Sequence, residues 1–108
     1  MVKNLEKINI LKKEKINKGL EFLEKNDNNK SIKKVIIFGS SVRNDCTENS
    51  DIDICFVTDS NCSDTNFFNI YGRLPLIMDN LCDIVIWNKI DTKLKKEIKN
   101  KGVVVYEL

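Results

Sequence analysis

The sequence predicts a small α/β (α+β) protein in which a mixed sheet of about four strands has helices packed on it. Three observations support this fold class. Amphipathic helical segments alternate with short β-branched runs along the chain. Hydrophobic residues make up 42% of the sequence and charged residues 31%, a balance typical of a globular protein. The 108 residues are enough for one domain with a real core, so the whole chain, 1–108, is expected to form a single domain.

The first half of the chain predicts one helix followed by two strands. Leucine and isoleucine recur at three- and four-residue steps over 5–25, which predicts an amphipathic helix. The β-branched and aromatic run 34–38 predicts a strand that ends at Gly39. A helical turn is expected over 40–43, and a second strand over 51–58.

A second helix is predicted after the second strand. Ser63 or Asp64 would cap its first turn. Gly72 and Pro75 are expected to break or restart this helix near Leu74.

The last third of the chain predicts a strand, a helix and a final strand. The apolar run 82–87 predicts the third strand, with its terminal tryptophan in the core. Asp91 or Thr92 would cap the last helix, and Gly102 would end it. The apolar tail 103–107 predicts a short fourth strand.

The residue types present limit the available chemistry. None of the cysteines forms a CxxC pair or a metal-ligand spacing, so all are predicted to be reduced thiols. They are Cys46, Cys55, Cys62 and Cys82. Histidine is absent, which excludes histidine-based nucleophile triads and histidine-ligated zinc. Any chemistry must therefore depend on carboxylates, hydroxyls, lysine or arginine.

Charge and hydropathy argue against two further classes. The net charge is only +2, so charge alone does not indicate nucleic-acid binding. No apolar run reaches the length of a membrane span, and the opening MVKNLEKINI is too polar for a signal peptide. Together with the reduced thiols, these features predict a cytoplasmic protein.

Three aspartates are candidate metal ligands. Side chains two residues apart in a strand point the same way, so Asp51 and Asp53 are expected on one face. Their Cβ atoms would be about 6–7 Å apart, a spacing that can bridge two metal ions about 3.5–4 Å apart. Asp83, near the start of the third strand, would join them if the two strands are neighbours. Three converging carboxylates repel one another unless a cation is bound, and Mg²⁺ suits such hard oxygen ligands.

Gly39, Ser40 and Arg43 are candidates for phosphate binding. A glycine that ends a strand lets the backbone approach a ligand, and a following helical turn presents N–H groups and a hydroxyl to an anion. Arg43, one turn on, can add a charge-assisted contact to the same phosphate. Each feature alone is ordinary, and their combination in this order points to a site. The loop acids Asp45 and Glu48 are interpreted as solvated.

The segment FGSSVRNDCTENSDIDI resembles the signature of the nucleotidyltransferase superfamily typified by DNA polymerase beta. In size and element order the chain is most similar to the minimal nucleotidyltransferases, and its closing KGVVVYE is similar to their tail. The resemblance implies the polymerase beta-like nucleotidyltransferase fold. It implies that Gly39 and Ser40 bind nucleotide phosphates. It also implies that Asp51 and Asp53 bind metal, and that Asp83 completes the metal site and helps to activate the attacking hydroxyl.

The reaction implied by the resemblance is attack of a hydroxyl on the α-phosphorus of ATP, assisted by two Mg²⁺ ions, with pyrophosphate leaving. Minimal nucleotidyltransferases resemble, as a group, the antitoxin partners of HEPN-domain ribonucleases. The leading hypothesis is therefore a protein adenylyltransferase that transfers AMP to a tyrosine of a HEPN toxin and silences it. Many members carry glycine at the position of Asn44, a conservative difference within a turn.

Two alternatives remain open. The chain could be a non-catalytic antitoxin, a binding module that neutralises its partner by forming a complex. It could also transfer a nucleotide to a small molecule such as an aminoglycoside, which the short chain disfavours unless a dimer builds the pocket. A homo-oligomer and a hetero-oligomer are both compatible with the sequence.

Overall fold

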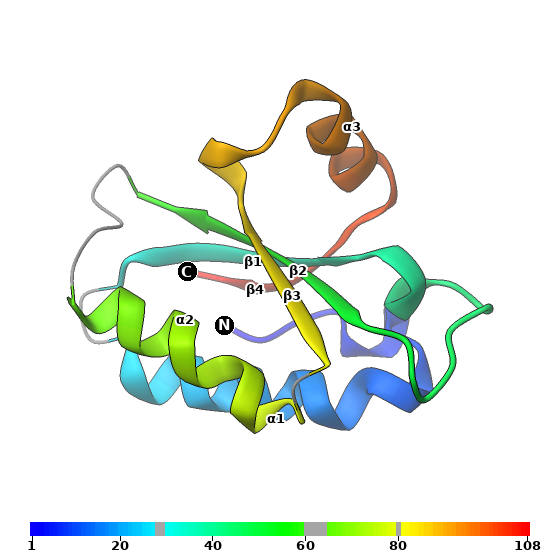
Figure 1. The fold of residues 1–108 in the computed structure, drawn as a ribbon, viewed down its shortest axis with the longest axis horizontal. Helices are drawn as coiled ribbons and strands as arrows, with labels where there is room; N and C mark the ends of the chain where they lie inside the picture. Colours follow the sequence, from blue (N-terminus) through cyan, green and yellow to red (C-terminus); the bar gives the residue numbers. More distant parts are fainter. Residues whose placement is uncertain (28–29, 60–64, 80) are drawn as a thin grey trace.

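The computed structural model describes residues 1–27, 30–59, 65–79 and 81–108. Its strands and helices are β1 (Ile32–Phe38), β2 (Ile52–Thr58), β3 (Cys82–Ile86), β4 (Val103–Glu107), α1 (Ile10–Asn26), α2 (Thr65–Ile77) and α3 (Thr92–Lys101). The sheet order is β3-β2-β1-β4, with β1 antiparallel to β2 and β4, and β2 parallel to β3. Helices α1 and α2 lie on one side of the sheet and α3 on the other (Figure 1). The predicted fold class and mixed four-stranded sheet are confirmed.

The first helix begins later than the sequence predicts. Leu5–Lys7 forms a separate 3-10 turn, and α1 starts only at Ile10. The break falls at Asn9, whose side-chain oxygen accepts a hydrogen bond from the Leu11 N–H at 3.0 Å. The Asn9 N–H also donates to the Ser41 carbonyl at 2.7 Å. An N-cap and a contact with a distant segment therefore outweigh the periodicity that favoured one continuous helix.

Helix α2 runs unbroken through the position where a break or restart is predicted. Pro75 lies inside it, in its last turn, and exposed Gly72 does not interrupt it. Leu74 is 2% exposed, and it lies with Met78 against Gly19 of α1. Burial of these side chains stabilises the helix, and the proline removes only one backbone hydrogen bond near its end.

Two hydrophobic clusters join the helices to the sheet. The larger lies on the side of α1 and α2, and Ile52 and Ile54 of β2 belong to it. The smaller lies on the side of α3 and contains Cys55 of β2 and Ile98 of α3. Alternate residues of β2 thus face opposite sides of the sheet. Asp53, two residues before Cys55, consequently lies on the α3 side.

The remaining elements match the prediction to within two residues. Strand β1 begins at Ile32, and β3 ends at Ile86. Trp87 opens a 3-10 turn, is only half-buried and packs against the smaller cluster, so it lies at the edge of the core rather than within it. The Asp91 side chain accepts a hydrogen bond from the Leu94 N–H at 2.8 Å, as expected of the predicted cap of α3.

The cysteines of the described residues are free thiols. Cys46 and Cys55 are buried and Cys82 is half-buried. Burial raises the pKa of the Cys55 thiol to about 11. Cys62 and the predicted caps at Ser63 or Asp64 lie outside the described residues. None of the described helices combines the length and apolarity needed to cross a bilayer.

Candidate active site

The candidate site begins where β1 ends. Gly39 has a φ of +73°, in the left-handed region that side chains other than glycine's rarely allow. A Cβ at this position would run into the Asp53 carboxylate and lie 3.1 Å from its Cγ. Glycine is therefore required both by the backbone conformation and by the space available. The turn after β1 lies directly against the carboxylate of β2.

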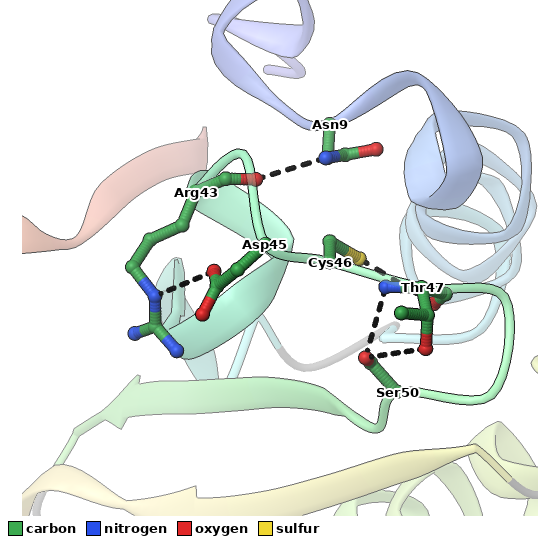
Figure 2. A network of polar contacts seen from close by, with 6 residues as sticks. All are labelled: Asn9, Arg43, Asp45, Cys46, Thr47 and Ser50. Carbon is green, nitrogen blue, oxygen red and sulfur yellow. Dashed lines mark hydrogen bonds and ion pairs between the residues drawn. The ribbon is translucent and has the colours of Figure 1, made fainter.

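The turn itself is fixed from two sides. Gly39–Val42 forms a single 3-10 turn, close to the predicted helical turn. Asn9 connects this turn to the start of α1, because its side-chain amide donates to the Arg43 carbonyl at 2.8 Å (Figure 2). The Asn9 N–H holds the Ser41 carbonyl as well. Held between β1 and α1, the turn places Ser40 at the wall of an open hollow.

The parallel pairing of β2 with β3 brings two of the predicted carboxylates together. Asp53 and Asp83 are direct partners in the strand register. Neighbouring strands lie about 4.7–4.9 Å apart, and paired residues of parallel strands project from the same face. The predicted neighbourhood of the two strands is confirmed. Asp51 lies just before β2 rather than inside it, and both Asp51 and Asp83 are exposed.

The three acids influence one another electrostatically. Burial raises the pKa of Asp53, and the negative charges of Asp83 and then Asp51 raise this pKa further. Both effects disfavour the ionised form of the Asp53 carboxyl. A cation bound next to Asp53 would stabilise the ionised carboxylate and so lower this pKa, which means that the electrostatics of the site favour a positively charged ligand.

The three aspartates are the type of ligand that Mg²⁺ prefers, although their side chains do not meet around one metal position. Carboxylate oxygens are the hard ligands that Mg²⁺ prefers, and Mg²⁺ usually keeps water and substrate phosphate as its other ligands. Within the described residues, no three carboxyl or thiol side chains are close enough together to hold a metal ion as they stand. Asp51 and Asp53 line the open hollow, and Asp83 is not part of its lining. A metal here would therefore depend on ligands from outside the protein.

The hollow has a volume of about 470 Å³ and lies at the end of the sheet where β1 stops and β2 begins. It brings together five of the six predicted site residues. These are Gly39, Ser40, Arg43, Asp51 and Asp53. Three further residues that the sequence analysis did not single out complete its lining. These are Phe38, Ser50 and Glu97.

Arg43 is paired with an acid that was interpreted as solvated. Its Nε donates to Asp45 Oδ1 at 3.0 Å (Figure 2). The hydrogen bond and charge of Asp45 raise the pKa of Arg43, and the same hydrogen bond lowers the pKa of the Asp45 carboxyl. Both side chains are more than half exposed, so water weakens this ion pair. The arginine is thus oriented at the hollow by a partner that a phosphate could replace.

Glu97 is the functional candidate that sequence reasoning missed. It belongs to α3 and lines the hollow together with Arg43, Asp51 and Asp53. Its negative charge raises the pKa of both Arg43 and Asp53, as a smaller contribution in each case. In the sequence it is the only acid in the lysine-rich run TKLKKEIKNK. That position carries no signal of proximity to the aspartates, because only the tertiary fold brings α3 to them.

A turn that offers N–H groups and a hydroxyl, an arginine, and a group of carboxylates can together bind a phosphate and a metal ion. The polymerase beta nucleotidyltransferase family model matches residues 14–108 of the chain. No curated protein sequence matches this chain.

Several solved structures share the fold, among them the following three. A chain from a toxin–antitoxin crystal structure with AMP-PNP has a TM-score of 0.67 and 22% identity, over 85% of this chain and 73% of that one. A chain from the toxin–antitoxin MntA–HepT has a TM-score of 0.61 and 21% identity, over 87% and 71%. A chain from the complex of the tri-AMPylated Shewanella oneidensis HEPN toxin with MNT antitoxin has a TM-score of 0.60 and 17% identity, over 87% and 73%. At these identities the likeness shows the fold alone.

Proposed function

The chain belongs to the polymerase beta nucleotidyltransferase family, and on this premise we propose that it transfers AMP from ATP to a hydroxyl of a partner protein in a Mg²⁺-dependent reaction. The observation that carries the proposal is the register of β2 and β3, in which Asp53 pairs with Asp83 next to the Gly39 turn. The proposal takes these acids as ligands for a metal ion and the N–H and hydroxyl groups of the turn as ligands for a phosphate, and the closeness of Asp53 to both Asp83 and Gly39 supports it.

The residues of the site divide between two tasks. Asp51, Asp53 and Asp83 would hold Mg²⁺, which when bound neutralises phosphate charge and lowers the pKa of a coordinated hydroxyl. Ser40 and the N–H groups of its turn would hold the outer phosphates of ATP. Arg43 would exchange Asp45 for a phosphate oxygen, a stronger charge-assisted partner. Catalysis would then come mainly from positioning and electrostatic stabilisation.

In the transfer step, the acceptor oxygen forms a bond to the α-phosphorus. The bond from the α-phosphorus to the oxygen that bridges it to the β-phosphorus breaks, and pyrophosphate leaves with that oxygen. The proton of the acceptor hydroxyl passes to a carboxylate. Asp83 suits this task because it is exposed and lies on β3, the edge strand of the sheet, where a large acceptor can reach it.

The proposed partner is a HEPN-domain ribonuclease toxin, which this protein would silence as a cytoplasmic antitoxin. Two of the structures that share its fold support this partner by what they contain. One is a toxin–antitoxin with AMP-PNP, and the other holds an AMPylated HEPN toxin in complex with MNT antitoxin.

A non-catalytic antitoxin is the second candidate, and two observations favour it. The described acids do not converge on a metal position as they stand, and Arg43 is already paired with Asp45. A protein that acts only by forming a complex needs neither a metal ion nor a free arginine.

Labelled nucleotide separates the two candidates. The purified protein is incubated with Mg²⁺, α-labelled ATP and a lysate of its host, beside an Asp51→Asn/Asp53→Asn variant. We expect a labelled protein band that requires both aspartates and Mg²⁺. The catalytic proposal fails if no pool is labelled and the double variant captures the same host protein as the wild type. Label in small molecules rather than protein would indicate a small-molecule acceptor.

A further inference from the structure

Lys12 is buried in a way that lysines rarely are. Its side chain is 0% exposed and is among the largest fully buried side chains of the described residues. A buried ammonium is unfavourable unless it is hydrogen-bonded or paired. Lys12 Nζ donates to the backbone carbonyl of Glu48 at 2.9 Å. Of the ion pairs between described residues, none involves Lys12. The Glu48 carbonyl is therefore the polar partner of the buried Lys12 ammonium.

The carbonyl belongs to the segment that leads into the candidate site. We call residues 43–51 the site loop, since it connects the turn after β1 to β2. The loop closes on itself, because the Thr47 N–H donates to Ser50 Oγ at 3.0 Å (Figure 2). The Ser50 N–H also donates to the Thr47 carbonyl at 3.1 Å. Ser50 and Asp51, at its end, line the hollow. The position of the loop thus determines where these two side chains lie.

The first turn of α1 holds the site loop at two points. Asn9 is the N-cap of α1, and Lys12 lies in the first turn, three residues later. The Asn9 side-chain amide donates to the Arg43 carbonyl at 2.8 Å, and Lys12 donates to the Glu48 carbonyl at 2.9 Å. One contact fixes the start of the loop, and the other fixes it three residues before Asp51. The loop itself forms no regular helix or strand that could hold its shape without these contacts.

We infer that Lys12 is a positioning residue for the candidate site: its buried ammonium holds the Glu48 carbonyl and so fixes Ser50 and Asp51 at the wall of the hollow. The inference builds on the proposed function, because it assigns Lys12 to the support of a proposed metal ligand. Lys12 does not touch the substrate. Its effect passes through the backbone of the site loop.

The test compares Lys12→Met with Lys13→Met. Methionine keeps an unbranched apolar chain but cannot donate to the Glu48 carbonyl. Lys13 is the matched control, because it is partly exposed and lines a separate hollow on the outer surface of α1. Binding of Mn²⁺, a substitute for Mg²⁺, is measured by electron paramagnetic resonance, and the amide exchange of Thr47 and Ser50 is measured by hydrogen–deuterium exchange. Neither readout requires nucleotide transfer.

For Lys12→Met we expect faster exchange at both loop amides and a Mn²⁺ affinity lower by roughly tenfold, a loss typical when a group that orients a metal ligand is removed. Lys13→Met should match the wild type in both readouts. The inference is overturned if folded Lys12→Met binds Mn²⁺ as the wild type does and its loop amides exchange at wild-type rates. Wild-type protein that binds Mn²⁺ without transferring nucleotide would refute the proposed function and leave this comparison intact. Wild-type protein that binds no Mn²⁺ would overturn both.

Should Lys12→Met fail to fold, the wild-type protein decides the question by nuclear magnetic resonance. The Lys12 ammonium is then expected to give a slowly exchanging ¹⁵N signal that shifts when Mg²⁺ is added. The inference would be overturned if the ammonium protons exchange as rapidly as those of exposed lysines, or if the chemical shift of the signal does not change when Mg²⁺ is added.

Discussion

Replacement of Gly39 by alanine is the substitution to which the candidate site should be most sensitive. The residue has a φ of +73°, and an added Cβ would meet the carboxylate of Asp53. The left-handed conformation alone costs an alanine about 1–2 kcal/mol relative to glycine. The clash must also move either the turn or Asp53, which brings the expected loss of folding free energy to about 2–3 kcal/mol. For a chain of this size such a loss lowers the melting temperature by about 10 °C.

The assay is thermal unfolding followed by circular dichroism, together with Mn²⁺ binding to the folded protein at low temperature. Gly72→Ala is the matched control, because Gly72 lies inside α2 with open space around its Cβ position. Alanine there is expected to stabilise the protein by about 0.5–1 kcal/mol. The reasoning is refuted if Gly39→Ala has the same melting temperature as the wild type and binds Mn²⁺ equally well. The turn would then not lie against Asp53 as described.

Three further substitutions test the electrostatics of the hollow. Asp53→Asn is expected to raise the melting temperature of the metal-free protein by about 2–4 °C at neutral pH. Thermal unfolding of both proteins at a series of pH values tests the direction of this change. The pKa of Asp53 in the folded protein lies above its value in the unfolded chain. The stability of the wild type should therefore decrease as the pH rises from the ordinary aspartate range through the folded pKa. The asparagine variant should not show this decrease. Asp45→Ala releases Arg43 from its ion pair and is expected to tighten ATP binding about twofold in calorimetry, whereas unchanged or weaker binding would show that Asp45 does not compete with phosphate for Arg43. Glu97→Gln removes a negative charge from the lining and should strengthen binding of metal-free ATP about two- to fivefold, with little effect if Glu97 points away from the phosphates.

The parts of the fold that sequence could predict are those determined by neighbouring residues. Strands such as 34–38 and 51–58 are short β-branched runs between polar segments, and the Asp91 cap acts only three residues along the chain. The candidate site residues between Gly39 and Asp53 could be proposed for the same reason, because they follow one another closely in the chain. The pairing of Asp53 with Asp83 followed once the two strands were assumed to be neighbours, an assumption that the register confirms.

The features that sequence could not predict depend on contacts between distant segments. Asn9 ends the helical pattern because it binds Ser41 and Arg43. Pro75 fails to break α2 because Leu74 and Met78, on either side of it, are buried against α1. Glu97 enters the hollow only because α3 packs on the sheet. In each case a long-range interaction outweighs or adds to a local preference.

The most direct test of the central claim measures nucleotidyl transfer by single carboxylate variants. The host protein labelled by the wild type is purified and incubated with Mg²⁺, α-labelled ATP and one of three variants, Asp53→Asn, Asp83→Asn or Asp79→Asn. Asp79 is the control, since it is exposed, lies just after α2 and has a positive φ that asparagine tolerates. We expect transfer to fall on the order of 100-fold or more for Asp53→Asn and Asp83→Asn and to stay at the wild-type rate for Asp79→Asn. Wild-type transfer by Asp83→Asn would contradict the claim that the paired strands β2 and β3 form one catalytic site.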